Sequence, residues 1–508
     1  MRHKLTGTIT SPDVEQVFST TPEISHLWNH HRRRRFALLV PANKPGPDLC
    51  KMVASATVLG YPSPILINWG QDFSNSVSRS WGAYLAKITG TLDYLDHVTQ
   101  PNTHRGERLD DDDLVLMVDA YDIWFQLPPD TLLQRYHQTN HDANSRLAAQ
   151  WKNSNRMPMK QTIIAAAQKR CFPTMESGSN LYCDDLPQSN LRSDLYGSPT
   201  DTDSEKKYYH NVRPRFLNSG TFMGPVGDMR RYLRRVKQRM ERVIAEHLDF
   251  EGDQGIFGEI FGEQELWRKW RRDQERLSSL NDTFKPSDIR SPALWQRDFE
   301  FHVGLDYSQQ MFLPTVYAED DGLFLSLENR SFIQQQSSKL GIDPVRLDGI
   351  PNDISQTLND VADVLPNGVA TDTDGIGWER MSLYADFYTA SIPALLHHNA
   401  WKDNAKARRT RWWDQTWYFP HLRHMLERRL KSHKRGAIGR VSRQNTEVAY
   451  YPPGSDLKSN LPRVYSRDRL KDGFQVVTLD EACRYPDESS NKAWYDEVLR
   501  DRRGPIEL

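Results

Sequence analysis

The sequence lacks any long apolar run. A membrane-spanning helix needs about eighteen consecutive apolar residues, and no such stretch occurs in the chain. The first residues, MRHKLTGTITSPDVEQVF, also lack the apolar segment of a signal peptide. We therefore expect no membrane span, and no export signal is visible.

An excess of one charge is missing as well. The chain has 66 Lys and Arg against 67 Asp and Glu, a formal charge of −1. No global field therefore favours nucleic acid or an anionic membrane as a partner. Charge is uneven only locally, as in the four consecutive aspartates of 110–113, which we interpret as a solvated turn.

Cysteine is scarce. The four residues Cys50, Cys171, Cys183 and Cys483 have spacings that match no zinc-binding pattern. Cys171 and Cys183 enclose a short polar loop containing Gly and Ser, which a disulfide would suit.

Short apolar runs alternate with segments of helical spacing, a rhythm that predicts a doubly wound α/β unit. Strands are predicted at 36–40, 65–68, 114–118, 163–167 and 216–224, and helices at 48–59, 84–95, 129–136, 229–247 and from Asp253 onward. A strand pair around Phe312 and Phe324, the end of a last core strand at 395–399, and a helix near 417–430 complete the prediction.

The expected fold class is thus α/β, with a mixed but mainly parallel sheet flanked by helices. The expected organisation is a polar leader at 1–31, one main α/β domain at 32–402, and a basic, aromatic C-terminal extension at 403–508. Three polar stretches within the domain are interpreted as loop insertions, at 172–212, 264–300 and 340–378.

Two carboxylates follow the predicted strand at 114–118. Asp119 and Asp122 flank a tight Ala-Tyr step and form a DxxD motif. Ligands of open α/β sheets bind outside the carboxyl ends of the strands, and two adjacent carboxylates favour a divalent cation between them. Aspartate also caps helices well, so the spacing alone leaves a metal site and a helix cap equally open.

Three later motifs follow the DAYD segment in a distinctive order. They are FLNSG at 216–220, DQ at 253–254 and HHN at 397–399. Together with DAYD they resemble the GT-A glycosyltransferases, and above all the glycosyltransferase domain of the collagen lysyl hydroxylases and the procollagen galactosyltransferases. The resemblance covers 36–260, 301–328 and 393–402. It implies a GT-A (Rossmann-like) fold and a metal-dependent transfer of a hexose, of the glucose or galactose class, from a UDP-sugar to a glycan or protein hydroxyl, with retention of configuration.

The resemblance also implies roles for individual residues. Asp119, Asp122 and His397 would hold Mn²⁺ or another divalent cation, with His398 as the alternative to His397. Asp253 and Asn218 would be catalytic, near the donor sugar and the acceptor. The residues implied to contact the nucleotide or the sugar are Pro41, Ala42, Lys87, Tyr121, Ser219, Gly220 and Asn399.

Other interpretations remain open from the residues themselves. Lys87 also fits ordinary surface charge on a helix, Asp253 fits a helix N-cap, and a lone His fits a core position. Two other classes of function are alternatives: a different metal-assisted nucleotidyl or phosphoryl enzyme, and a non-catalytic binding module with the same fold. The former predicts additional carboxylates around a second ion.

The resemblance has limits. The residues after Asn399 contain no His-x-Asp pair with a distant His, so the iron-dependent hydroxylase activity of the resembling enzymes is not expected. The resemblance implies the lumen of the secretory pathway, in the endoplasmic reticulum or Golgi, as the place of action.

Overall fold

The structure is a computed structural model. It describes residues 30–73, 82–151, 156–174, 178–202, 209–246, 252–278, 299–355, 359–366, 371–372, 375–399, 407–432, 436–443, 446–454, 459–466, 474–487 and 492–507. Most of the predicted leader, and residues 279–298 of the predicted 264–300 insertion, lie outside these ranges.

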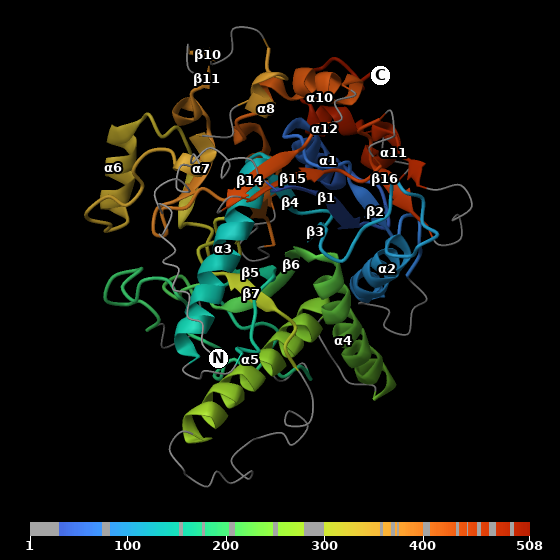
Figure 1. Ribbon diagram of the computed structural model, residues 1–508. Helices are drawn as coiled ribbons and strands as arrows, with labels where there is room; N and C mark the ends of the chain where they lie inside the picture. The colour runs from blue at the N-terminus through green and yellow to red at the C-terminus, as the bar shows by residue number, and fades with distance from the viewer. Residues whose placement is uncertain are drawn as a thin grey trace, which may run out of the picture.

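A large mixed sheet forms the centre of the molecule (Figure 1). Within the described ranges it has ten strands, in the order β17-β16-β2-β1-β3-β6-β5-β7, with β15 and β14 continuing from β1. Most neighbours are parallel, whereas β6, β14 and β17 run antiparallel to their partners. The bounds are β1 (His30–Pro41), β2 (Ile65–Ile67), β3 (Leu114–Val118), β5 (Ile163–Gln168), β6 (Phe216–Pro225), β7 (Val303–Asp306), β14 (Gly439–Arg443), β15 (Thr446–Tyr451), β16 (Arg463–Tyr465) and β17 (Gln475–Val476). The predicted α/β class with a mixed sheet and flanking helices is confirmed.

Helices cover both faces of this sheet, and strand β3 shows the consequence. All five of its residues are buried. Leu114, Leu116 and Val118 pack into one apolar cluster, whereas Val115 and Met117 pack into another on the opposite face. Successive side chains of a strand point to opposite faces, so an unbroken apolar run is what a strand between two helical layers requires.

The two layers use different parts of the chain. On one face lie α1 (Pro47–Val58), α3 (Pro129–Gln150), α10 (Leu422–Lys431), α11 (Leu479–Cys483) and α12 (Trp494–Val498). On the other face lie α2 (Gly82–Val98), α4 (Val226–Ala245) and α5 (Gly252–Ser278). Figure 1 shows α4 and α5 together below the sheet, and α1 among the C-terminal helices above it.

Three smaller sheets lie beside the main one. The first contains β4 (Ile123–Phe125), β13 (Leu395–His397) and β8 (Phe312–Pro314), the second β9 (Gly322–Leu325) and β12 (Leu383–Asp386), and the third β10 (Thr371–Asp372) and β11 (Gly375–Ile376). The remaining elements are short: α6 (Arg330–Lys339), α7 (Asn352–Ser355), α8 (Asn359–Ala362), α9 (Arg408–Arg411) and the 3₁₀ turns η4 (Trp378–Arg380), η6 (Trp413–Gln415) and η7 (Phe419–His421).

One strand prediction is wrong in its pairing. The strands around Phe312 and Phe324 exist, but β8 pairs with β13 and β9 pairs with β12, so they do not form a pair with each other. The error arises because an apolar run predicts that a strand forms but not which distant strand it joins. The last core strand predicted at 395–399 is present as the buried β13, which lies in the three-stranded sheet.

Two helices are longer than predicted. Helix α3 continues to Gln150, well beyond Tyr136. Helix α5 continues through 264–278, which the sequence analysis interpreted as part of an insertion. The many charged side chains of this stretch suggested exposure to solvent. Arg268 is instead buried, in ion pairs with Glu265 and Glu300 at 2.8 and 2.6 Å. The described parts of the predicted 172–212 loop contain no helix or strand.

The region after residue 403 is joined closely to the N-terminal elements, as the adjacent red and blue ribbons of Figure 1 show. Strand β15 pairs in parallel with the first half of β1, and β16 pairs in parallel with β2. A disulfide joins Cys50 of α1 to Cys483 of α11. This region, which the sequence analysis separated as an extension, therefore supplies β14 to β17 of the main sheet.

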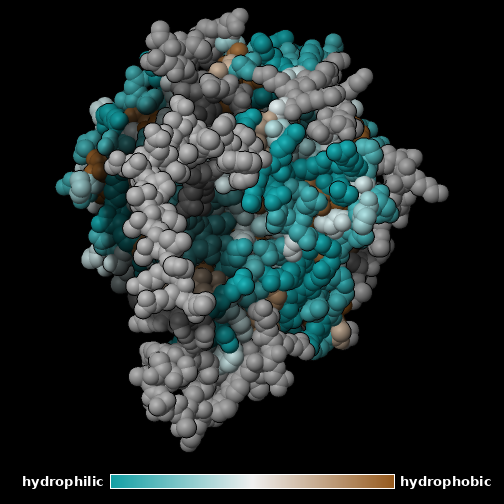
Figure 2. All heavy atoms as spheres, in the orientation of Figure 1, coloured by the Kyte–Doolittle hydropathy of each residue, from teal (hydrophilic) through white to brown (hydrophobic). Residues whose placement is uncertain are grey.

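The second disulfide joins Cys171 to Cys183, as predicted. Among the described residues no helix has the length and apolar character needed to cross a membrane. The face drawn in Figure 2 is mostly hydrophilic where it is coloured, with only scattered hydrophobic residues. Most buried apolar side chains of the described residues belong to two clusters, one on each face of the sheet.

Candidate metal centre

The two aspartates of the DxxD motif lie at the carboxyl end of β3. The backbone N–H of Asp119 donates to the carbonyl of Gly220 at 2.9 Å, which continues the β3–β6 pairing by one residue. Asp122 comes just before β4, and its carbonyl accepts a hydrogen bond from the N–H of His398 at 2.7 Å. Backbone pairing on both sides therefore fixes where the two carboxylates point.

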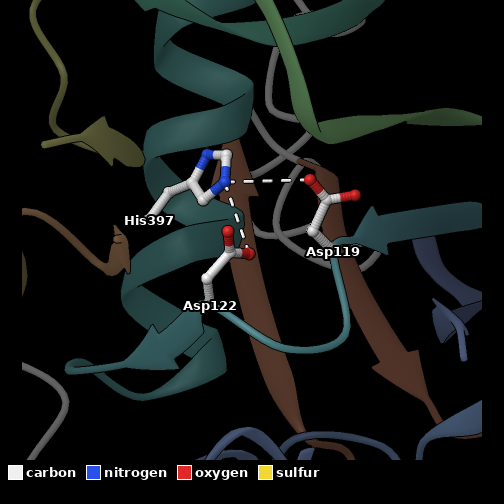
Figure 3. Close-up of side chains that lie close together, drawn as sticks. All are labelled: Asp119, Asp122 and His397. Atoms are coloured by element: carbon white, nitrogen blue, oxygen red, sulfur yellow. Dashed lines mark ion pairs between the residues drawn. The ribbon is translucent and has the colours of Figure 1, made fainter. Parts of the chain in front are cut away.

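His397 completes the group from a distant part of the chain. Its register on β13 places it opposite Ile123 of β4 and Pro314 of β8. Its Nε2 lies 3.7 Å from Asp119 Oδ2 and 3.4 Å from Asp122 Oδ1, as the dashed lines of Figure 3 show. One ligand atom from each of the three residues lies within 4.8 Å of the others, the spacing expected of groups that could share an ion.

His398 faces the other way. Successive residues of a strand alternate between faces, and the ring of His398 packs 4.1 Å from Trp124 and 5.9 Å from Trp412. Burial lowers the pKa of His398 to about 3, so its ring stays neutral. The structure thus brings His397, and not His398, to the aspartates.

Asn218 orients the His397 ring. Its Oδ1 lies 3.1 Å from His397 Nδ1 and also accepts the N–H of Gly220 at 3.0 Å. Its Nδ2 donates to Gln168 Oε1 at 2.9 Å and to Gln254 Oε1 at 3.1 Å, so the orientation of the amide is determined. His397 Nδ1 therefore donates to Asn218, and Nε2 is the ring nitrogen that faces the aspartates and could bind an ion.

Gly220 makes room for the histidine. A Cβ atom at this position would lie 2.1 Å from His397 Cε1 and 2.5 Å from Nδ1. These distances are far below van der Waals contact, so any side chain at position 220 must displace the imidazole. A glycine in the middle of a strand often marks such a close approach.

Replacing Gly220 by alanine should therefore damage the centre selectively. We expect Mn²⁺ affinity to fall at least about tenfold, because displacing an oriented ligand costs about as much as losing the groups that orient it. Isothermal titration calorimetry measures the affinity. Gly46→Ala is the matched control, because a Cβ at Gly46 meets nothing within 4 Å. Equal Mn²⁺ affinity in both variants would contradict the assignment of His397 as a ligand.

Lys87 lies beneath the carboxylates and is buried. Its ammonium contacts Asp119 Oδ1 at 2.7 Å, the carbonyl of Ser219 at 2.7 Å and Asp253 Oδ2 at 2.8 Å. The first two contacts are hydrogen bonds, and the third is an ion pair. Lys87 is thus not ordinary surface charge on a helix, and it links Asp253 to the metal group.

The two aspartates differ in their pKa values. Burial raises the pKa of Asp119 to about 6, against the lowering effect of Lys87. Burial acts on Asp122 in the same direction, but the neighbouring His397 outweighs it, and the pKa of Asp122 is lowered to about 2. An ion needs deprotonated ligands, so the raised pKa of Asp119 means that protons compete with an ion at this carboxylate more than at Asp122.

The remaining predicted residues make contacts of their own. Tyr121, between the two aspartates, directs its hydroxyl to the carbonyl of Lys44 at 3.1 Å. Asn399 holds the backbone N–H of Val316 through its Oδ1 at 3.1 Å. The carbonyl of Ser219 accepts a hydrogen bond from Lys87. Pro41 is the last residue of β1, and the buried Ala42 follows it.

Two residues that orient the centre were given no role from the sequence. Gln168 ends β5 and Gln254 follows Asp253, and both amides receive hydrogen bonds from Asn218. Gln254 also donates to the carbonyl of Phe172 at 2.8 Å, next to the Cys171–Cys183 disulfide. Gln254 is the second residue of the DQ motif, whereas the signal for Gln168 is only a polar amide at the end of a predicted strand.

The donor set fits a divalent cation. Ligands about 2.1 Å from an ion in octahedral geometry stand about 3 Å apart when adjacent, close to the 3.4 and 3.7 Å found here. Two carboxylates and an imidazole suit Mn²⁺ and several other first-row metals. The side chains of Asp119 and Asp122 are 32% and 22% exposed, so an ion can reach them from solvent.

Comparison with known proteins adds no assignment. Models of known protein families do not match this chain, and a search of curated proteins found no match either. Function is therefore inferred below from the residues of the centre and from the motifs that contain them.

Proposed function

We propose that the protein is a metal-dependent glycosyltransferase of the GT-A type. It would transfer a hexosyl group, of the glucose or galactose class, from a UDP-sugar to a hydroxyl of a glycan or protein. The observation that carries the proposal is the meeting of Asp119, Asp122 and His397 at the carboxyl end of β3. This is the edge of an α/β sheet where ligands bind.

The chemistry of transfer explains why such a centre is needed. The bond between the anomeric carbon and the diphosphate oxygen breaks, a bond from that carbon to the acceptor oxygen forms, and the proton of the acceptor hydroxyl is released to water. The leaving UDP gains negative charge, which a bound divalent cation neutralises. In this scheme Asp119, Asp122 and His397 hold the cation.

Neighbouring residues would orient the donor and its sugar. Asp253 would lie near the anomeric carbon and the acceptor hydroxyl, at a distance from the cation set by Lys87. Asn218 would act through His397, as a positioning residue with no contact to the sugar. The carboxyl end of β1 at Pro41 and Ala42, together with Tyr121, would border the nucleotide.

Two disulfides support a place of action in the secretory pathway. The Cys50–Cys483 and Cys171–Cys183 bonds leave no free cysteine in the chain. Stable disulfides are typical of proteins that fold in an oxidising compartment. The proposed UDP-sugar chemistry and the disulfides therefore point to the same compartment.

Thermal unfolding with ligands tests the proposal first. Mn²⁺ together with UDP should raise the melting temperature, because ligand at about 100 times its Kd stabilises the folded state by about 2.7 kcal/mol. Mn²⁺ with ADP serves as the control for nucleotide preference. If no nucleoside diphosphate shifts the melting temperature in the presence of any divalent cation, the transferase proposal is wrong.

Slow hydrolysis of the donor then identifies the sugar. A panel of UDP-sugars, scored by release of UDP, should show turnover with UDP-glucose or UDP-galactose and dependence on the added cation. Binding of UDP without turnover of any donor would favour a binding module with the same fold.

A further inference from the structure

The loop between the two aspartates is held at Tyr121 from two sides. On one side, the Tyr121 hydroxyl lies 3.1 Å from the carbonyl of Lys44 and 3.2 Å from Asn43 Oδ1. On the other side, the carbonyl of Tyr121 accepts a hydrogen bond from Arg409 Nη1 at 2.7 Å. Arg409 comes from α9, nearly three hundred residues away in the sequence.

Arg409 is itself fixed by helix α1. Its Nη1 lies 2.9 Å from Asp48 Oδ2, in the first turn of that helix. The backbone carbonyl of Arg409 accepts a hydrogen bond from Lys51 Nζ at 3.4 Å. Lys51 is fully buried and pairs with Glu497 of α12 at 2.6 Å. An arginine held at both its carbonyl and its guanidinium has little freedom left, so it can act as a rigid support.

The position of this support matters for the centre. One backbone hydrogen bond anchors Asp119 to Gly220 of β6, and another anchors Asp122 to His398. The peptide between the two aspartates is held at Tyr121, so a shift of the Tyr121 carbonyl would move the two carboxylates relative to each other. Asp48, 2.9 Å from Arg409 Nη1, offsets part of the charge that Arg409 brings near the cation.

We propose that Arg409 is a positioning residue of the metal centre, supplied by the C-terminal region. It fixes the Tyr121 peptide and thereby the geometry with which Asp119 and Asp122 receive a divalent cation. This inference rests on the metal-binding part of the proposed function and extends the site to a segment beyond all the motifs that suggested it. Groups that orient metal ligands commonly contribute about 10–100-fold to metal affinity.

The chain offers a matched control in the preceding residue. Arg408 has the same charge and lies on the same short helix, but its guanidinium contacts the carbonyl of Glu319 at 2.9 Å and Asp320 at 3.4 Å. The two arginines thus differ in what they hold, so Arg409→Ala and Arg408→Ala remove equal charge from neighbouring positions.

The experiment is titration of each full-length variant with Mn²⁺ alone, together with its melting temperature without metal. Arg409→Ala should weaken Mn²⁺ binding by about 10–100-fold, whereas Arg408→Ala should bind like the unsubstituted protein. Arg409→Lys should fall between them, because a lysine keeps the charge but cannot hold the Tyr121 carbonyl and Asp48 with a rigid fork. If Arg409→Ala does not fold, the Mn²⁺ affinity of Arg409→Lys, compared with that of the unsubstituted protein, tests the inference instead.

Three results would overturn the inference. The first is wild-type Mn²⁺ affinity in Arg409→Ala and Arg409→Lys while Asp119→Ala binds no metal, which would show that the metal centre exists but that Arg409 does not position it. The second is a lower metal-free melting temperature of Arg409→Ala with unchanged Mn²⁺ affinity, which would show that Arg409 is only structural. The third is wild-type Mn²⁺ affinity in Asp119→Ala, which would show that the proposed metal centre does not exist.

Discussion

Replacing Asp119 by alanine should abolish both the stabilisation by Mn²⁺ with UDP and the turnover of a UDP-sugar. Asp119 is one of three groups that could hold the cation, and its Oδ1 also receives Lys87 at 2.7 Å. A cation that stabilises a leaving diphosphate contributes several kcal/mol, so its loss should lower turnover at least about a hundredfold. Donor hydrolysis and thermal unfolding, each with and without Mn²⁺, measure the two effects.

Asp110→Ala is the control for this experiment. Asp110 is also an aspartate near β3, but it is exposed and lies beyond the other end of the strand, where 110–113 form a turn. It should leave metal stabilisation and turnover unchanged. If Asp119→Ala or Asp122→Ala keeps the turnover of the unsubstituted protein, the DxxD motif does not hold the catalytic cation.

Removing the Cys50–Cys483 disulfide should have the largest effect on stability. The bond joins residues separated by 433 positions and ties α11 to α1. A cross-link that closes so long a loop restricts the unfolded chain most, and the expected loss on replacing both cysteines by alanine is about 4–5 kcal/mol. Thermal or denaturant unfolding of Cys50→Ala/Cys483→Ala, compared with the unsubstituted protein, measures the loss.

The other disulfide provides the comparison. Cys171 and Cys183 are separated by only 12 positions, so their replacement by alanine should cost less, about 3 kcal/mol. A Cys50→Ala/Cys483→Ala variant no less stable than Cys171→Ala/Cys183→Ala would show that the C-terminal region is held to α1 by its packing and ion pairs, and that the disulfide adds little.

Much of the fold could be predicted from local pattern. The apolar run at 114–118 became β3, and the runs at 36–40 and 163–167 lie within β1 and β5. The helical spacing at 48–59 became α1. These predictions are correct because the spacing of apolar residues along the sequence shows whether an element is buried on one face or on two.

Other elements could not be recognised from the spacing of their apolar residues. The charged stretch at 264–278 continues α5, because buried ion pairs around Arg268 satisfy side chains that usually face solvent. Strands β15 and β16 pair with β1 and β2, which lie more than three hundred residues earlier in the sequence, and β14 and β17 join the sheet only through β15 and β16. A composition that is basic and aromatic does not distinguish a strand of the main sheet from a tail.

The sequence by itself determined the α/β class, the position of Asp119 and Asp122 after a buried strand, and the list of residues that could complete a site with them. Only the tertiary structure decided which of those residues meet. The register of β13 directs His397 toward the aspartates and His398 toward Trp124, and α9 brings Arg409 to Tyr121. The physical reason is that residue periodicity encodes which face of an element is buried, whereas the contacts between distant elements depend on strand register and packing, which no local stretch of sequence contains.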